Sequence, residues 1–208
     1  MKVLLLGFGK MNQLIFDLFE ENIVGICDVN RFEIREYPDV IIDFSHSDFF
    51  PKVLEMIEKF QCPTVIGTTN YDKEKIAQIR EISKNIPILM SSNFSVGIYL
   101  LEKMLKENEK ILSMFDKEII ETHHTKKLTS PSGTALSLSN ILNTDKITSI
   151  RIGEVVGIHE VILERDYEVI SINHCVNNRC VYAVGAWNAA KWLIKQKSGF
   201  YTFKDIYE

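Results

Sequence analysis

A run of twenty-one residues concentrates side chains that carry protons and bind anions. Residues 119–139 read IIETHHTKKLTSPSGTALSLS and include two histidines and two lysines. The first part is apolar enough for a β-strand, in which successive side chains point to opposite faces. His123 and His124 should therefore diverge, and we expect the two imidazoles to have different tasks.

The turn that follows these side chains is typical of an anion site. The sequence Pro-Ser-Gly-Thr at 131–134 runs directly into the apolar stretch ALSLSNIL, which predicts a helix. The amides of Gly133 and Thr134 would then lie at a helix N-terminus, where a carboxylate is stabilised. Together with the histidines and lysines upstream, this turn predicts a pocket for a small acid that must also be protonated.

Two other interpretations of the same run stay open. A pair of histidines could ligate a metal, but no third ligand stands at a suitable spacing, and Lys126 and Lys127 would repel a cation. We therefore predict no metal site. The second alternative is a solvated surface cluster without function, because a run of His and Lys is often simply an exposed face.

A second group of residues, near the N-terminus, favours a dinucleotide. GFGKM at 7–11 follows the apolar run VLLL and precedes a helical pattern, so Gly7 and Gly9 would allow a tight turn against a pyrophosphate. Asn12 stands where a fuller glycine fingerprint has its third glycine, which weakens the signal. Asp28 ends the next apolar run and could accept hydrogen bonds from the ribose, whereas Arg31 could meet a 2′-phosphate. NADH and NADPH therefore both remain possible.

Two further strand ends carry small polar residues. Phe-Ser-His at 44–46 follows VIID, and Gly-Thr-Thr at 67–69 follows TVI. Ligands of open α/β sheets bind outside the carboxyl ends of the strands, so both are candidate cofactor-lining loops. Each one alone is also typical of an ordinary turn.

The pattern of the first 90 residues predicts a doubly wound, Rossmann-like parallel sheet. Apolar strand candidates at 3–6, 23–27, 40–44, 64–67 and 86–90 alternate with helical patterns, and each parallel pairing requires a crossover. Residues 28–40 leave little room for a helix. We expect that connection to be a loop with at most one turn.

The second half of the chain predicts a separate α+β domain. Strand patterns at 117–124, 147–153, 155–164 and 167–176 follow a helix at about 96–108 and contain only one convincing helix, at 132–142. Strands in succession indicate a mixed or antiparallel sheet. The pattern is helical again at 183–196. We expect a dinucleotide-binding domain at 1–93 and 183–208, and a substrate-binding and oligomerisation domain at 94–182.

Composition excludes several classes of protein. The chain has 208 residues, 46% of them hydrophobic, and a net charge of -4, so no global basic field exists to hold nucleic acid or an anionic membrane. The first apolar run is too short for a signal peptide or a membrane span. Four cysteines without CxxC spacing are typical of reduced thiols, buried or half-buried. We expect a cytoplasmic protein.

These residues resemble the dihydrodipicolinate reductase family, also called 4-hydroxy-tetrahydrodipicolinate reductase, of lysine and diaminopimelate biosynthesis. The family signature is similar to E-x-H-H-x-x-K-x-D-A-P-S-G-T-A, and residues 121–135 read ETHHTKKLTSPSGTA, with Thr129 and Ser130 in place of Asp-Ala. The blocks VIIDFSHS, VIGTTNYD, SSNFSVGIYLL, RIGEVVGIHEV, INHCVNNR and GFYTFKDI also resemble the family, in family order.

The resemblance implies the reduction of a small cyclic dicarboxylate by NADH or NADPH in a cytoplasmic homotetramer that assembles through the second domain. It implies that His123 gives or takes a proton, that Lys127 is the general acid, and that His124, Gly133 and Thr134 hold the substrate carboxylates. The implied cofactor residues are Gly7, Phe8, Gly9, Lys10 and Met11 for the phosphates, Asp28 for the ribose, and Gly67, Thr68, Thr69, Ser91, Ser92, Asn93 and Phe94 for the nicotinamide side.

The sequence also allows other functions. The departures at Asn12 and at Thr129-Ser130 could mark a degenerate or regulatory homologue that binds cofactor without turnover, and a reductase of another small imino or oxo acid would share the domain plan. His159, His174 and Arg179 could line the substrate pocket as a cationic set or could be half-exposed strand residues.

Overall fold

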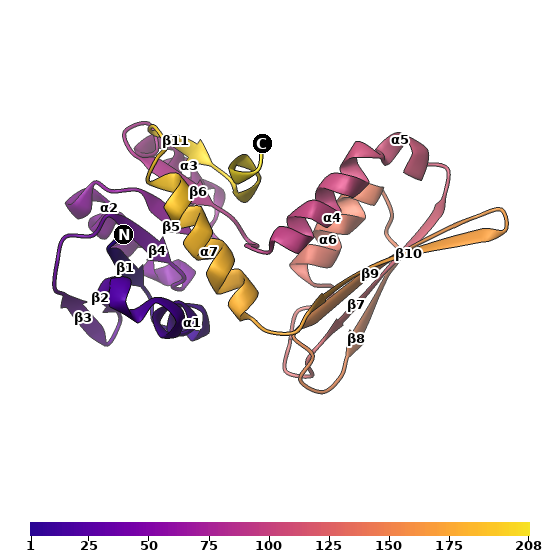
Figure 1. Cartoon of the computed structure of the whole chain (residues 1–208), viewed down its shortest axis with the longest axis horizontal. Coiled ribbons are helices and arrows are strands. Elements are labelled where there is room, and N and C mark those ends of the chain that lie inside the picture. Colours follow the sequence, from indigo (N-terminus) through magenta and orange to yellow (C-terminus); the bar gives the residue numbers. More distant parts are fainter. The chain divides into compact units, whose positions relative to one another are not determined.

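The chain folds into two compact units in a computed structural model that describes all residues, 1–208. The first unit combines Met1–Phe94 with Cys180–Glu208, and the inserted unit is Ser95–Arg179 (Figure 1). None of the helices combines the length and the apolar composition of a membrane span. The α/β class expected from the sequence, a Rossmann-like sheet plus a second mixed sheet, is confirmed.

The first unit is built on a seven-stranded sheet in the order β11-β6-β5-β4-β1-β2-β3. Its strands are β1 (Val3–Leu6), β2 (Ile23–Asp28), β3 (Arg31–Ile34), β4 (Val40–Asp43), β5 (Thr64–Ile66), β6 (Pro87–Met90) and β11 (Gly199–Tyr201). Its helices are α1 (Lys10–Phe19), α2 (Phe50–Phe60), α3 (Lys73–Ile82) and α7 (Cys180–Leu193), with short 3₁₀ turns at Glu20–Asn22, Ser47–Phe49 and Phe203–Ile206. All pairings are parallel except that of β2 with β3.

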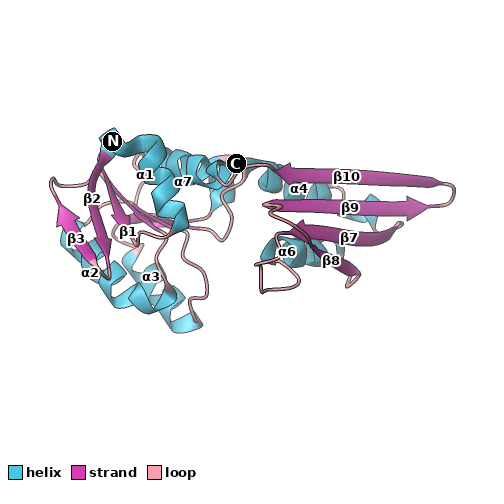
Figure 2. Ribbon diagram, turned by 90° about the horizontal axis from the view of Figure 1, so that it is seen from below, coloured by secondary structure: helices cyan, strands magenta, loops and turns pink.

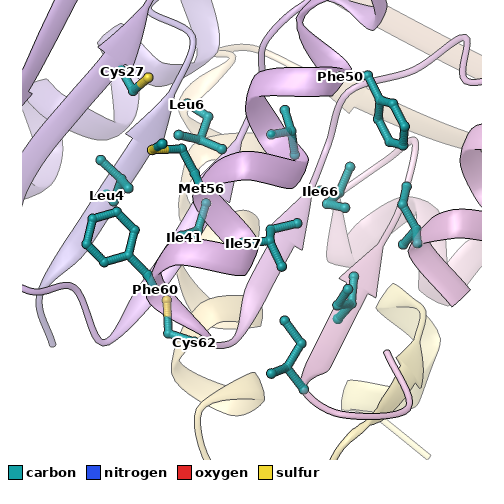
Figure 3. Close-up of a cluster of buried hydrophobic side chains, with 14 of the residues drawn as sticks. Leu4, Leu6, Cys27, Ile41, Phe50, Met56, Ile57, Phe60, Cys62 and Ile66 are labelled. Carbon is teal, nitrogen blue, oxygen red and sulfur yellow. The ribbon is translucent and has the colours of Figure 1, made fainter. Parts of the chain in front are cut away.

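Helices cover both faces of this sheet because its central strands are apolar on both sides. On one face Met56, Ile57 and Phe60 of α2 pack against Leu4 and other strand side chains (Figure 3). On the opposite face α7 packs beside α1, where the rings of Phe19 and Trp187 stack with their centroids 4.0 Å apart. The small residues of α7 allow close approach: a Cβ on Gly185 would lie 1.8 Å from the carbonyl oxygen of Phe94.

The segment between β2 and β4 differs from expectation. Instead of a loop with at most one turn, residues 31–34 form β3, which pairs antiparallel with β2 through a tight turn, so that Asp28 lies opposite Arg31. The expected absence of a helix was correct, but the strand was missed. Its sequence, RFEI, alternates polar and apolar residues, which suits an edge strand with one exposed face.

The inserted unit is a four-stranded sheet covered by helices on one face. Its elements are α4 (Val96–Glu107), α5 (Glu109–Leu112), β7 (Asp116–His123), α6 (Gly133–Leu142), β8 (Ile147–Arg151), β9 (Gly157–Arg165) and β10 (Glu168–Val176). The strand order is β10-β9-β7-β8, and only β7 and β8 are parallel, because α6 connects them. Leu101, Leu138 and Val161 belong to the core of this unit. Helices α4 and α6 lie on the same face of the sheet (Figure 2).

The four cysteines are free thiols. Cys27 and Cys62 are buried, and burial raises the pKa of Cys62 to about 12. Cys180 is partly buried. Cys175 is exposed on β10, which differs from the expected buried or half-buried thiols.

Candidate active site

The turn between β1 and α1 is shaped for a bound anion. Gly7 has φ +78°, and a Cβ there would come within 2.7 Å of the Cα of Ser45, so no other residue fits without a shift. At Gly9 an added Cβ would meet nothing within 4 Å, which leaves open space in front of the helix. Helix α1 begins after Gly9 without a side-chain cap, so its first amides are not satisfied by a capping side chain. This cradle fits a dinucleotide phosphate.

Asn12 stabilises the turn rather than interrupting it. Its side chain is fully buried, and its Nδ2 donates to the carbonyl oxygens of Leu6 and Gly7 at 2.7 and 2.8 Å. The Oδ1 atom has no partner. The sequence analysis treated Asn12 as a weakness of the glycine fingerprint. In the structure, its side-chain amide holds the main chain at the last residue of β1 and at the glycine that follows.

Asp28 and Arg31 lie at the neighbouring end of β2 and β3. Asp28 is partly exposed at the last position of β2, where it can accept hydrogen bonds. The Arg31 guanidinium lies 5.5 Å from the ring centroid of Phe8 and pairs with Glu33 at 2.9 Å. An acceptor and a cation therefore flank the same edge of the turn.

The other expected cofactor residues follow β5 and β6, whose carboxyl ends share an edge with those of β1 and β2 because these strands run parallel. Several of them have packing roles. Gly67 gives room to the ring of Phe44, because a Cβ there would lie 2.1 Å from that ring. Phe94 is buried, with its ring centroid 5.5 Å from that of Phe44. Thr69 and Ser92 are exposed, and Ser91 donates to the carbonyl oxygen of Asn93 at 2.6 Å.

A buried carboxylate ties two of these loops together. Asp43, the last residue of β4, accepts from the backbone N and the Oγ of Ser45 at 3.0 and 2.6 Å, and from the Tyr71 hydroxyl at 3.2 Å. Burial raises the pKa of Asp43, opposed by these hydrogen bonds and by one with Thr68. Thr68 is 4% exposed, so its side chain belongs to this cluster. Asp43 was not among the residues predicted from the sequence.

At the end of β7, the alternation of the strand places Glu121 and His123 on the buried face. His123 Nδ1 forms a short hydrogen bond with Glu121 Oε2. The Arg151 guanidinium, at the end of β8, binds the same carboxylate with both terminal nitrogens, at 2.8 and 3.0 Å. Nδ1 is thereby occupied, and Nε2 of His123 lies beside Gly157, where an added Cβ would come within 3.2 Å.

The charges of this group follow from its burial and contacts. Burial alone would raise the pKa of Glu121, but hydrogen bonds from Arg151, Ser149 and His123 lower it to about 2. Burial lowers the pKa of His123, opposed by Glu121 and reinforced by Lys127 and Arg151. Glu121 is therefore an anion at neutral pH, and neutral His123 carries its proton on Nδ1.

The two adjacent lysines have different surroundings. Lys126 is exposed and pairs with the exposed Glu154 at 3.1 Å. Lys127 is partly buried, and its charge contributes to the lowered pKa values of both His123 and His159. Lys127 is therefore the lysine that lies near the buried histidines.

Helix α6 begins where the sequence predicted an anion site. Its N-cap is Ser132, whose Oγ accepts from the backbone N of Ala135 at 3.2 Å. Ser132 Oγ also lies 3.1 Å from His159 Nε2 on β9. Gly133 is exposed, with open space where a side chain would stand, and Thr134 is partly exposed. A cis peptide bond joins Ser130 to Pro131 just before the cap.

The remaining histidines do not form a cationic set. Burial lowers the pKa of His159 to about 4, and burial also lowers the pKa of His174, whose Nε2 lies 3.4 Å from Ser95 Oγ. Both are therefore neutral at pH 7. His124 is partly exposed, and its carbonyl oxygen accepts from the backbone N of Lys127 at 3.1 Å. Arg179 is partly exposed at the last position of the inserted unit.

Sequence reasoning missed three residues of this site. Arg151 had no recognisable signal, because only the register of β7 with β8 places it opposite His123. Ser132 and Glu121 stood within the quoted run but received no role. For Glu121 the signal was available, since residues two apart on a strand share a face. No group of three His, Cys, Asp or Glu side chains is placed to hold a metal ion.

Comparison with known proteins covers nearly the whole chain. The family model for the N-terminus of dihydrodipicolinate reductase matches residues 24–94, and the model for its C-terminus matches residues 97–207. A 4-hydroxy-tetrahydrodipicolinate reductase from Thermosipho africanus (strain TCF52B) is 42% identical over 205 residues, covering 96% of this chain and 94% of its own. Another, from Brachyspira hyodysenteriae (strain ATCC 49526 / WA1), is 38% identical and covers 99% of each chain.

A solved structure supports the fold. The dipicolinate-bound dihydrodipicolinate reductase from Paenisporosarcina sp. TG-14 matches with a TM-score of 0.78 over 97% of each chain, at 19% identity. The matches to the family models and to these relatives define a pyridine-nucleotide-dependent oxidoreductase. The chain belongs to the dihydrodipicolinate reductase family.

Proposed function

We propose that this protein reduces 4-hydroxy-tetrahydrodipicolinate to tetrahydrodipicolinate with NADH or NADPH, a step of lysine and diaminopimelate biosynthesis. Family membership over nearly the full chain supports the reaction. The observation that carries the proposal is the grouping of Lys127, His123 and the start of α6 in one unit. That grouping offers an ammonium, an imidazole and helix amides to a small diacid.

Lys127 is the proton donor of the proposed mechanism. Loss of water from C4 gives a ring with a conjugated imine, a hydride adds to C4, and a proton adds to C3. The bound reduced nicotinamide supplies the hydride. An ammonium keeps its proton at neutral pH, especially beside substrate carboxylates, and can release it to a developing carbanion. His123, neutral with a lone pair on Nε2, then acts as the partner that relays a proton rather than as the primary acid.

The substrate carboxylates are assigned to the start of α6 and to His124. The Gly133 and Thr134 amides lie in the first turn of the helix, where the helix dipole favours a negative charge. The open space at Gly133 leaves room for a carboxylate to approach the main chain. His124 would add a further donor from the strand end.

The cofactor is assigned to the carboxyl edge of the first sheet. Gly7, Phe8, Gly9, Lys10 and Met11 would hold the phosphates and Asp28 the ribose. Residues 67–69 and 91–94 would line the nicotinamide side. Support comes from the open space at Gly9 and the uncapped start of α1. Asp28 and Arg31 at the same edge are compatible with either NADH or NADPH.

A homotetramer assembled through the inserted unit is part of the proposal. One face of the four-stranded sheet packs against α4 and α6, and no helix of that unit covers the other (Figure 2). That second face carries Ile150 and Val169, which are 41% and 65% exposed. Apolar strand residues of this kind suit contact with further copies. The free thiols are compatible with the cytoplasm, a reducing compartment.

A coupled assay tests the function. The substrate is generated enzymatically from pyruvate and aspartate semialdehyde, and the oxidation of NADH and of NADPH is followed in parallel. We expect oxidation that depends on both precursors. Cofactor binding without substrate-dependent oxidation would instead identify a regulatory homologue. Faster turnover with other cyclic imines or oxo acids would show that the protein acts on a different substrate.

A further inference from the structure

The carboxylate of Glu121 is fully buried and is held by Arg151 and His123, with a further hydrogen bond from Ser149. Its side chain has no exposure, and Arg151 binds both oxygens while His123 Nδ1 bonds to one. A bidentate pair with a guanidinium is the geometry that fixes a carboxylate in one plane. The imidazole that bonds to such a carboxylate is fixed in orientation and in tautomer.

The same guanidinium reaches the loop that follows β7. Nη2 of Arg151 donates to the carbonyl oxygen of Thr129 at 2.8 Å, in addition to its bond with Glu121. Thr129 lies between Lys127 and the N-cap Ser132 along the chain. Because the contact uses the main chain, it does not depend on the side chain at position 129, where the family signature has Asp.

A purely structural role explains these contacts poorly. A buried ion pair seldom stabilises a fold more than apolar residues of similar size would. Here the pair is joined to the imidazole of His123, at the end of the strand that leads into the proposed acid loop.

We propose that Glu121 and Arg151 are positioning residues that present Nε2 of His123 to the substrate and couple that orientation to the loop carrying Lys127. The inference rests on the proposed reductase function and names two residues that act through others. Glu121 fixes the Nδ1–H tautomer. Arg151 fixes Glu121 and, through Thr129, the course of the loop toward Ser132.

Steady-state kinetics of Glu121→Gln and Arg151→Lys test the inference. Gln keeps the shape but loses the charge, and Lys keeps the charge but cannot bind both oxygens and the Thr129 carbonyl. We expect kcat to fall about 10- to 100-fold in each, a loss on the scale of general acid-base catalysis, while KM for NADH stays within about two-fold. The matched control is Glu107→Gln on α4, where Glu107 pairs with Lys103 at the surface, and its kcat should be unchanged.

The pH profile gives a readout that a structural role would not move. The groups that face His123 are Glu121, Lys127, Arg151 and His159. Of these only Glu121 raises the pKa of His123, so Glu121→Gln should move the acidic limb of the kcat profile to lower pH. A normal kcat and an unmoved limb in a folded Glu121→Gln enzyme would overturn the inference.

The tautomer of His123 can also be measured in the unmodified chain, so the inference can be tested even if the variants fail to fold. Long-range ¹H–¹⁵N correlation spectra of protein labelled at histidine report the tautomer of each ring, and His123→Gln assigns the signal. We expect the Nδ1–H tautomer at pH 7.5, and the Nε2–H tautomer would refute the positioning role. An unmodified enzyme that binds NADH but oxidises none with substrate would refute the proposed function instead, whatever the tautomer.

Discussion

The β1–α1 turn and the end of β7 hold their proposed ligands in opposite ways. The turn is made of main chain: glycines provide the space, and Asn12 holds two carbonyl oxygens. The β7 end is made of charged side chains, with Glu121 held by Arg151 and His123. A site that only binds needs shape, whereas a site that moves a proton needs groups whose charge is controlled. Variants in the two regions should therefore affect different kinetic constants.

The largest effect is expected at Lys127. Lys127→Ala should lower turnover by roughly 100-fold or more, the usual scale for loss of a general acid, with KM for NADH unchanged. Initial rates in the coupled assay measure it. The matched control is Lys126→Ala, because Lys126 forms only an exposed pair with Glu154 and should keep nearly full turnover. Equal losses in the two variants would remove Lys127 from the acid role.

In the turn between β1 and α1, Gly7→Ala should weaken the binding of the cofactor. The methyl group would meet Ser45, and the positive φ is strained for alanine, so we expect about 1–3 kcal/mol of lost stability and about a ten-fold rise in KM for NADH. Gly153→Ala is the control, since Gly153 has φ +50° but open space around it. It should lose stability through strain alone. If both variants bind NADH normally, the turn is not the phosphate site.

Acid should destabilise the fold through His159. Its folded-state pKa of about 4 lies below the ordinary imidazole value of 6.5, so the unfolded chain takes up the proton first as the pH falls. The stability that neutral His159 contributes is present in full above pH 6.5 and is lost progressively as the pH falls from 6.5 to 4. Between pH 7.5 and pH 5, urea unfolding should show a loss of stability that is about 2 kcal/mol smaller in His159→Gln than in the unmodified chain. The same loss in the variant would assign the effect to another group.

The smallest effect is expected at the start of α6. Thr134→Ala keeps the backbone amide but removes the hydroxyl beside it. We therefore expect KM for the dicarboxylate to rise about five-fold, the scale of one hydrogen bond, and KM for NADH to stay unchanged. Kinetics with each ligand varied in turn would measure both constants. A rise in both, together with a lower unfolding midpoint, would mean that residues 131–134 serve only as a helix cap.

Local sequence patterns predicted those structural features that are determined by a few adjacent residues. The period of two along β7 placed His123 and His124 on opposite faces, and the glycines at 7 and 9 placed a tight turn between strand and helix. The start of α6 was predicted because its cap and apolar run are contiguous. These are the features in which a few adjacent residues fix the backbone.

Features that depend on register could not be predicted. Arg151 meets Glu121 only because α6 returns the chain so that β8 pairs with β7 in one particular alignment. The role of Asn12 depends on carbonyl oxygens five and six residues away, and a comparison with glycine patterns treats it as a defect. The three-residue strand β11 was missed because its pairing with β6 joins residues more than a hundred positions apart.

The interruption of the first unit between Phe94 and Cys180 sets an order of events during synthesis on the ribosome. Strand β6 emerges early, but its partner β11 and the helix α7 that packs beside α1 are translated last. The inserted unit is continuous, so it can complete its own core while the earlier sheet still has an unpaired edge and an uncovered face. The first unit, whose synthesis begins before that of the inserted unit, is therefore the unit that completes its fold last.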